Sequence, residues 1–273
     1  MPTDFQIEIP IPTDFLKSIL PAAAFAVALM FVIWLLALRI KNLGIVDIAW
    51  SAAFAPIAIF FAATTHGDPA RRWLIAGMVA LWSLRLGSHL YFRVMGHHPR
   101  EDVRYEEMRA KWGKNLKAQS LLFFQIQAVT IVVLSVPFLL ACLNLRAGLM
   151  VFEYASVAIW LIAVAGESLA DFQLKQFKTN PASKGRVCQQ GLWRYSRHPN
   201  YFFEWLIWVA YFVFALGSPW GWVTIYCPAA MLFLLLRVTG IPMTEELAVK
   251  TKGDEYREYQ RTTSAFVPWF RKN

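Results

Sequence analysis

The sequence predicts an all-α, polytopic membrane protein: a bundle of seven transmembrane helices with its N-terminus outside and its C-terminus in the cytoplasm. Three observations lead to this fold class. First, 57% of the 273 residues are apolar and the mean hydropathy is +0.41, well above the norm for soluble domains. Second, seven apolar stretches have about the 20 residues that a bilayer requires. Third, the basic residues are unevenly distributed between the connections.

Each apolar stretch is bounded by polar residues, glycine or proline, as expected of separate spans. In chain order the stretches are Leu20–Leu38, Gly44–Ala63, Trp73–Tyr91, Leu121–Leu143, Phe152–Leu174, Tyr201–Leu216 and Trp220–Leu236. Only the sixth is short. We expect a single membrane domain over residues 1–273, with an N-terminal segment (1–19), the seven helices (20–236) and a cytoplasmic amphipathic tail (237–273).

The predicted orientation rests on the basic residues. The connections after the first, third and fifth stretches, together with the tail, hold 22 of the 27 lysines and arginines. Cytoplasmic connections of membrane proteins are enriched in these residues. The asymmetry therefore predicts an integral, multi-pass protein, which we expect in a bacterial inner membrane. It also accounts for the net charge of +9, so we expect no nucleic acid as a partner.

Several simple classes of site are not predicted. The first residues, Met1–Phe15, are polar and acidic, whereas a cleavable signal peptide begins with basic residues. The three cysteines have no metal-ligand spacing, and an odd number does not indicate a disulfide framework. The chain has no Gly-x-Gly-x-x-Gly motif after a strand, no Gly-Lys-Ser/Thr phosphate loop and no His-x-x-x-His pair. A dinucleotide would therefore have to be held by side chains, and no metal is expected.

Ionisable residues inside the apolar stretches are costly in lipid and indicate a cavity or a partner. Those that stand out are Asp47, Arg85, Glu167, Asp171 and Glu204. Glu167 and Asp171 are four residues apart, so they project from the same helical face, as do Asn200 and Glu204. We expect these four side chains to line a polar chamber closed by Arg85. The alternative is internal ion pairing that only orients the helices.

In the stretch Gly191–Trp205, a basic, polar loop is followed directly by the start of an apolar helix. Pro199 is placed to begin that helix. Arginine and lysine suit phosphates, whereas carboxylates and asparagine suit ribose hydroxyls and carboxamides. Both kinds of residue gather at the cytoplasmic ends of the fifth and sixth stretches: Lys178, Lys184, Arg186, Arg194, Arg197 and His198 beside Asp171, Asn200 and Glu204. A large anionic cofactor is the simplest ligand for this set.

Several motifs resemble a known family. Asp171–Lys178, Gly191–Glu204 and Phe266–Phe270 resemble the C-terminal half of the steroid 5-alpha-reductase superfamily. The segments that resemble its bacterial branch of uncharacterised, DUF1295-type membrane proteins are Ile45–Trp50, Arg104–Arg109 and Ser264–Trp269. This resemblance covers about residues 46–270. It implies a seven-helix reductase that transfers hydride from NADPH to a carbon–carbon double bond conjugated to a ketone in a lipophilic substrate.

The resemblance also implies roles for single residues. It places four residues on NADPH: Asp171, Arg186, Asn200 and Glu204. It places Arg85 near a phosphate, Lys178 where the reductases have Arg, and Glu167 where the steroid enzymes have Asn. Arg197 and His198 complete the expected set of cofactor-binding residues. The superfamily's catalytic Glu and Tyr have Asp47 and Trp82 as their nearest matches. We expect a protonated Asp47 to donate a hydrogen bond to the substrate carbonyl, with Trp50 or Trp82 packed on the flat substrate.

Two other functions remain open. Arg197–Tyr201 also resembles the Arg-His-Pro-x-Tyr segment of the membrane isoprenylcysteine methyltransferases, which use S-adenosylmethionine, and Glu245–Glu246 resembles their acidic pair. The run Asp171–Lys178 and the number of basic groups, sufficient for a pyrophosphate, favour the reductase. The intramembrane acids are also compatible with a transporter or a lipid-binding protein, but the chain shows no inverted repeat of broken helices.

Overall fold

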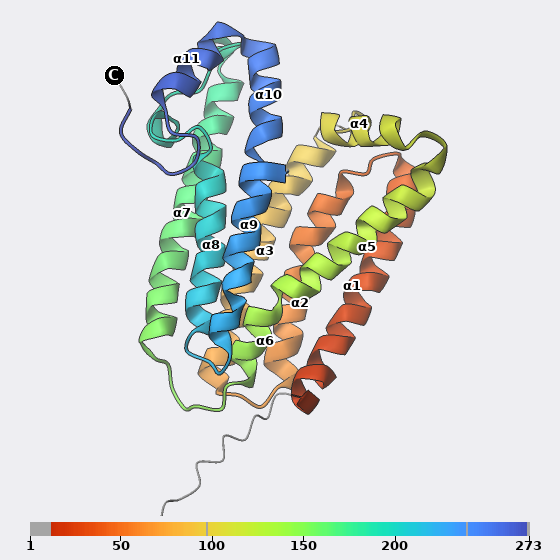
Figure 1. Ribbon diagram of the computed structural model, residues 1–273, viewed down its shortest axis with the longest axis vertical. Coiled ribbons are helices and arrows are strands. Elements are labelled where there is room, and N and C mark those ends of the chain that lie inside the picture. Colours follow the sequence, from red (N-terminus) through yellow and green to blue (C-terminus); the bar gives the residue numbers. More distant parts are fainter. Residues whose placement is uncertain (1–11, 97, 239, 272–273) are drawn as a thin grey trace, which may run out of the picture. The chain divides into compact units, whose positions relative to one another are not determined.

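The computed structural model describes residues 12–96, 98–238 and 240–271, and every regular element in these ranges is helical (Figure 1). Most of the N-terminal stretch Met1–Phe15, for which we expect no signal peptide, lies outside the described residues. The chain divides into two compact units, unit 1 (Met1–Leu149) and unit 2 (Met150–Asn273). Each unit is described by itself, and the single domain over residues 1–273 stays a prediction.

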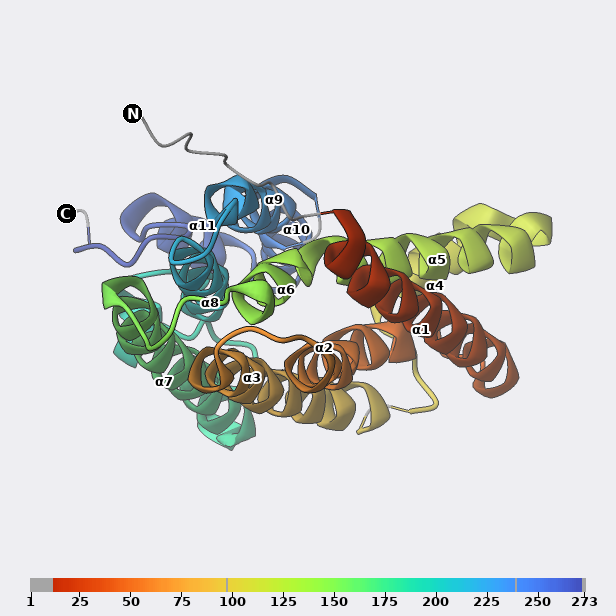
Figure 2. The same cartoon turned by 90° about the horizontal axis from the view of Figure 1, so that it is seen from below.

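Unit 1 is built around long apolar helices. Its elements are α1 (Pro12–Ile40), α2 (Ile45–Thr64), α3 (Pro69–Met95), α4 (Val103–Trp112), the short η1 (Gly113–Asn115), α5 (Leu116–Leu134) and α6 (Val136–Leu143). Helix α2 packs along α3, and α1 packs against α5 (Figures 1 and 2). Helix α4, which contains the segment Arg104–Arg109, lies at one end of the unit beside the start of α5.

Aromatic rings from three helices form the centre of unit 1. The rings of Phe54 in α2, Trp82 in α3 and Phe138 in α6 are fully buried. The Phe54 ring centroid lies 5.4 Å from that of Trp82 and 6.4 Å from that of Phe138, distances typical of favourable aromatic pairs. Large apolar side chains remain exposed on α1, among them Leu20 and Val32, as expected of a helix that faces lipid rather than water.

At the end of unit 1 that contains the start of α3, a buried arginine holds two segments of the chain together. Arg71, in the first turn of α3, is fully buried, and its Nη1 donates to the carbonyls of Asn144 (3.3 Å) and Arg146 (2.7 Å). Its Nη2 donates to the carbonyl of Gly148 (2.5 Å). The carboxylate of Asp68 caps α3 and also accepts from the backbone N–H of Gly148. The connection after α6 is thereby held against the start of α3.

Unit 2 contains α7 (Val151–Thr179), η2 (Pro181–Ser183), η3 (Gly191–Arg194), α8 (Pro199–Ala215), η4 (Gly221–Ile225), α9 (Tyr226–Phe233), the π-helical η5 (Leu234–Val238), α10 (Ile241–Lys252) and α11 (Asp254–Thr262). Helices α7, α8 and α9 run side by side, and α11 lies near the N-terminal end of α8 (Figures 1 and 2). Helix α7 approaches α8 closely at Gly166, where an added Cβ would lie 2.5 Å from the ring of Phe203. Ser156 Oγ joins the same two helices by donating to the carbonyl of Ala210 (2.7 Å).

Among the described residues, five segments are long and apolar enough to cross a membrane: Thr13–Ile40, Ile45–Thr64, Val103–Leu143, Val151–Thr179 and Gly221–Lys252. They support a membrane-embedded, multi-pass protein. The predicted third and sixth spans do form helices, α3 and α8. Helix α3 carries four arginines, however, and α8 has only 17 residues. Seven spans and the orientation of the termini therefore stay predictions.

Two predicted stretches are not single α-helices. The fourth is divided between α5 and α6 at Ser135, two residues before Pro137, whose ring cannot continue the helical hydrogen bonding of the preceding turn. The seventh begins as the 3-10 turn η4, continues as α9 and ends in the π-helical η5. Apolar composition indicates such a segment but does not reveal changes in the helical hydrogen-bonding pattern.

Candidate functional site

Helices α7 and α8 bring Asp171 and Asn200 together. Asn200 Nδ2 donates to Asp171 Oδ1 at 3.3 Å, and both side chains are half-buried. Pro199 starts α8 at its first position, which places Asn200 in the first helical turn. The two residues are 29 positions apart in the sequence. The fold thus pairs a carboxylate of α7 with a carboxamide of α8.

The two other acids of the expected chamber are buried in the same helices. Glu167 lies one turn before Asp171 on α7 and is 4% exposed. Glu204 lies one turn after Asn200 on α8 and is 8% exposed, and its Oε1 accepts a hydrogen bond from Trp208 Nε1 (3.1 Å). A buried carboxylate is tolerated only with polar partners. The four polar residues thus lie on α7 and α8, two helices that pack against each other.

The loop that leads into α8 is attached to α7. Gln173 Oε1 accepts from the backbone N–H of Leu192 (2.9 Å), and Trp193 Nε1 donates to the carbonyl of Ala170 (2.9 Å). Gly191 has a φ of +59°, and an added Cβ would lie 2.4 Å from the Gln173 side chain, so this turn requires glycine. The neighbouring Arg194 is exposed.

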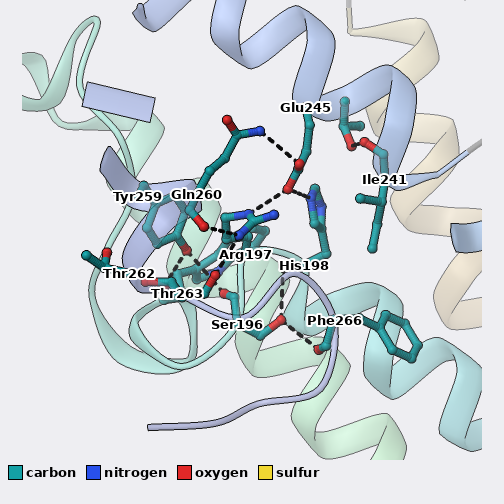
Figure 3. A network of polar contacts seen from close by, with 12 residues as sticks. Ser196, Arg197, His198, Ile241, Glu245, Tyr259, Gln260, Thr262, Thr263 and Phe266 are labelled. Carbon is teal, nitrogen blue, oxygen red and sulfur yellow. Dashed lines mark hydrogen bonds and ion pairs between the residues drawn. The ribbon is translucent and has the colours of Figure 1, made fainter. Parts of the chain in front are cut away.

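Arg197 and His198, two expected cofactor ligands, are engaged in a network with α10 and α11 (Figure 3). Arg197 Nε lies 2.6 Å from Glu245 Oε1, and Arg197 Nη1 donates to the carbonyls of Gln260 (2.9 Å) and Thr263 (2.5 Å). Gln260 Nε2 in turn donates to Glu245 Oε2 (2.9 Å). The guanidinium of Arg197 therefore fastens the loop to two helices, and its side chain is only 10% exposed.

His198 contacts the same carboxylate. Its Nε2 lies 3.2 Å from Glu245 Oε1, and its ring stacks on that of Tyr201. Burial lowers the pKa of His198 below its ordinary value, although the hydrogen bond to Glu245 acts in the opposite direction. The lowered pKa favours the neutral ring, whose Nε2–H would donate to Glu245 Oε1.

The remaining expected phosphate ligands lie on the surface of unit 2. Lys178 is exposed in the last turn of α7. Arg186 is also exposed, and its Nε is 3.4 Å from Glu255 Oε1, a carboxylate oxygen that also accepts from the backbone N–H of Val187. An ion pair this exposed contributes little to stability. The Arg186 side chain can therefore reorient toward an anion at small cost.

In unit 1, Asp47 is surrounded by donors from α3 and α4. The hydroxyl of Tyr105 donates to Asp47 Oδ1 at 2.6 Å. Asp47 Oδ2 accepts from Arg104 Nη2 (3.2 Å) and Arg93 Nη2 (3.4 Å). Both oxygens of Asp47 accept in this arrangement, whereas the mechanism expected from the sequence has Asp47 donate. The group that carries the donated proton here is the buried Tyr105.

The two tryptophans of the expected catalytic set have structural contacts. Trp50 Nε1 donates to Thr130 Oγ1 (2.9 Å), and the Trp50 ring meets Phe54 edge to face. Trp82 is fully buried in the aromatic centre of unit 1. Arg85 lies half-buried on α3. The functional roles of these three residues stay predictions.

The structure adds two residues, Tyr105 and Glu245, whose contacts with predicted site residues the sequence did not indicate. Tyr105 lies among charged residues of α4, and only the folded chain shows that its hydroxyl contacts Asp47. Glu245 was notable in the sequence only as one half of an acidic pair, yet its carboxylate contacts three side chains of unit 2, those of Arg197, His198 and Gln260. Within residues 12–96, 98–238 and 240–271, no group of three or more His, Cys, Asp or Glu could hold a metal ion.

Apolar helices and buried polar side chains define a membrane-embedded, multi-pass helical protein. The chain belongs to the family described as "Protein of unknown function (DUF1295)", whose model matches residues 33–263. It is also similar to an uncharacterized protein of Schizosaccharomyces pombe, with 27% identity over 271 residues that cover 87% of this chain and 76% of the yeast protein. No solved structure matches the chain.

Proposed function

We propose that this chain is a membrane-embedded reductase that uses NADPH to reduce a carbon–carbon double bond conjugated to a ketone in a lipophilic substrate. The observation that carries the proposal is the Asp171–Asn200 pair at the end of the α7–α8 contact. Carboxylates and carboxamides are suited to the hydroxyl and amide groups of a dinucleotide. Exposed cations on the same unit, Lys178, Arg186 and Arg194, are suited to its phosphates.

The residues of unit 2 fit such a cofactor in two ways. Asp171, Asn200, Glu167 and Glu204 would orient its neutral polar groups, whereas the exposed cations would hold its charge. Arg197 and His198 act differently from our expectation in this proposal, because their polar atoms are engaged with Glu245 and the end of α11. They position the loop that leads to Asn200. When bound, NADPH would supply the hydride.

We assign polarisation of the substrate carbonyl to the Asp47–Tyr105 pair of unit 1. The hydroxyl of Tyr105 is buried and already directed to an acceptor, and Asp47 together with Arg104 fixes its position. As the double bond is reduced, negative charge develops on the carbonyl oxygen, and the single O–H of Tyr105 would turn from Asp47 Oδ1 to that oxygen and stabilise the charge. The proton that completes the reaction at the α carbon comes from water. Each assignment rests on contacts within one unit.

The direct test is thermal stabilisation of the detergent-purified protein by NADPH, NADH and S-adenosylmethionine, added separately. A ligand at 100 times its dissociation constant adds about 2.7 kcal/mol to the stability of a protein that binds it only when folded. We expect NADPH to raise the midpoint of unfolding and Asn200→Ala to abolish most of that rise. Gln176→Ala, which removes an exposed carboxamide from α7, is the matched control and should keep the response.

A second candidate is the isoprenylcysteine type of methyltransferase. The structure joins the two segments that resemble that family, because Glu245 contacts both Arg197 and His198. Stabilisation by S-adenosylmethionine with no response to either nicotinamide nucleotide would favour this function over the reductase.

The proposal includes membership of the steroid 5-alpha-reductase superfamily, seven transmembrane helices, an outside N-terminus and a location in a bacterial inner membrane. Helix α8, with 17 residues, is about 26 Å long at 1.5 Å per residue, close to the thickness of a bilayer core. Cysteine-accessibility labelling of single cysteines placed near residues 66, 114 and 184 tests the orientation. Residues 114 and 184 should label from the cytoplasm and residue 66 from the outside.

A further inference from the structure

The C-terminal residues 264–271, which we call the C-terminal strap, run beside the loop that precedes α8. The backbone N–H of Arg197 donates to the carbonyl of Ser264 (2.8 Å), and Ser196 Oγ donates to the carbonyl of Phe266 (2.8 Å; Figure 3). The backbone N–H of Trp269 donates to the carbonyl of Tyr195 (2.9 Å). The strap is thus fixed at three points along its length rather than loosely attached.

A cavity of about 440 Å³ lies between the strap, the end of α11 and Arg197. This volume is within the range of small-molecule sites. No acidic residue occurs among the described residues that line the cavity, whereas Arg197 and Arg261 both line it. Glu245 neutralises Arg197. Arg261 pairs with Glu258 of its own helix, and its side chain is 77% exposed, so its charge is available to an anion at little cost.

A buried hydroxyl is the second polar feature. Thr263 lines the cavity and is 4% exposed, and its Oγ1 has no hydrogen-bond partner among the described residues. A buried hydroxyl without a partner lowers the stability of the folded chain, because it has lost its hydrogen bonds to water. A ligand with acceptor oxygens would remove this cost.

The other wall of the cavity is apolar and opens to the surface. Val267, Trp269 and Phe270 line it, and they are 50%, 66% and 77% exposed. Exposed aromatic rings in a membrane protein are typical of the level of the lipid headgroups. The lining therefore combines a cation, a hydroxyl and an apolar wall, which matches a molecule with an anionic head and an apolar tail.

We propose that this cavity binds the headgroup of an anionic phospholipid. The phosphate accepts hydrogen bonds from Arg261 and Thr263, and the first part of the acyl chains lies along Trp269 and Phe270. Basic pockets at the ends of membrane helices are known to take such headgroups. Because Arg197 lies beside the cavity and also fixes the loop before Asn200, bound lipid holds that loop in place.

The test compares unfolding of the detergent-purified full chain in micelles that contain phosphatidylglycerol, phosphatidylcholine or no lipid, and in micelles with water-soluble glycerol 3-phosphate. We expect phosphatidylglycerol to raise the midpoint by a few degrees and phosphatidylcholine to raise it much less. Equal shifts with the two lipids would overturn the proposal. A full shift with glycerol 3-phosphate alone would also overturn it, in favour of a site for a soluble phosphate.

Two variants and a control connect the shift to the cavity. Arg261→Gln should lose most of the phosphatidylglycerol response, whereas Arg257→Gln should keep it, because Arg257 pairs with Asp254 on the same helix but does not line the cavity. Thr263→Val should leave the lipid-free midpoint unchanged or raised, because it removes a buried hydroxyl without a partner, yet reduce the response. Equal responses in Arg261→Gln and Arg257→Gln would overturn the proposal, and so would a full response in Thr263→Val.

Discussion

Arg197 Nε and Glu245 Oε1 lie 2.6 Å apart, with side chains only 10% and 15% exposed. This buried ion pair links the loop before α8 to α10. Removing one partner of a buried pair leaves an uncompensated charge, which typically costs about 3–5 kcal/mol. We therefore expect Glu245→Ala to lower the midpoint of thermal unfolding strongly, measured on the detergent-purified protein.

The neighbouring residue provides the control for this substitution. Glu246 is exposed and pairs only with Lys250 on the same helix. Glu246→Ala should leave the midpoint nearly unchanged, since exposed ion pairs contribute little. Similar losses in both variants would show that α10 is sensitive to any charge removal and that the Arg197–Glu245 pair has no special role.

Protonation of His198 should destabilise unit 2. Because burial lowers the pKa of His198 in the folded chain, the unfolded chain takes up the proton first as the pH falls. The stability due to neutral His198 is complete above about pH 6.5, the unfolded value, and is lost as the pH falls from there toward the lowered folded value. The midpoint should fall over this window in the wild type and less in His198→Gln. Parallel curves for the two proteins would contradict this role.

The Asp47–Tyr105 contact predicts a division of roles. Tyr105→Phe removes the 2.6 Å hydrogen bond and keeps the ring, so we expect lower turnover with unchanged stabilisation by NADPH. Asp47→Asn should behave in the same way, whereas Asn200→Ala and Glu204→Ala should weaken cofactor binding first. Turnover is measured as NADPH oxidation with a panel of lipophilic enones. Equal losses of NADPH affinity in Tyr105→Phe and Asn200→Ala would contradict the division.

Arg71 should be essential to the stability of unit 1. It is fully buried and donates to three backbone carbonyls, so Arg71→Met leaves these carbonyls without their charged donor. We expect a loss of about 3 kcal/mol or more, from the magnitude of charged hydrogen bonds in the interior. Arg146→Met is the matched control, because the Arg146 side chain is exposed. A comparable loss of stability in Arg146→Met would show that the effect comes from removing a positive charge rather than from losing the three hydrogen bonds.

The sequence predicted elements better than contacts. Apolar stretches indicate where helices form, because a segment surrounded by lipid must satisfy its backbone hydrogen bonds internally. Pro199, as the first residue of α8, indicated that Asn200 lies in the first helical turn. The sequence did not reveal that Arg197 and His198 are engaged by Glu245, because residues 47 positions apart or more meet only through the fold. The same reason explains Tyr105, whose hydroxyl reaches Asp47 across 58 positions.

The hydropathy pattern indicated neither the break at Ser135 nor the π-helical η5. Hydropathy averages over many residues, so it reports that a segment is apolar and not which carbonyl each N–H contacts. Pro137 gave a local signal for the first break. For η5, Leu234–Val238, no residue type in the sequence marks the change.

The most direct test of the central claim, that unit 2 holds a nicotinamide dinucleotide beside Asp171 and Asn200, is the dissociation constant of NADPH for the purified protein. We expect saturable binding by the wild type, at least about tenfold weaker binding by Asp171→Asn, equivalent to about 1.4 kcal/mol, and unchanged binding by Gln176→Ala. Failure of the wild type to bind NADPH, or equal affinity in wild type and Asp171→Asn, would contradict the account.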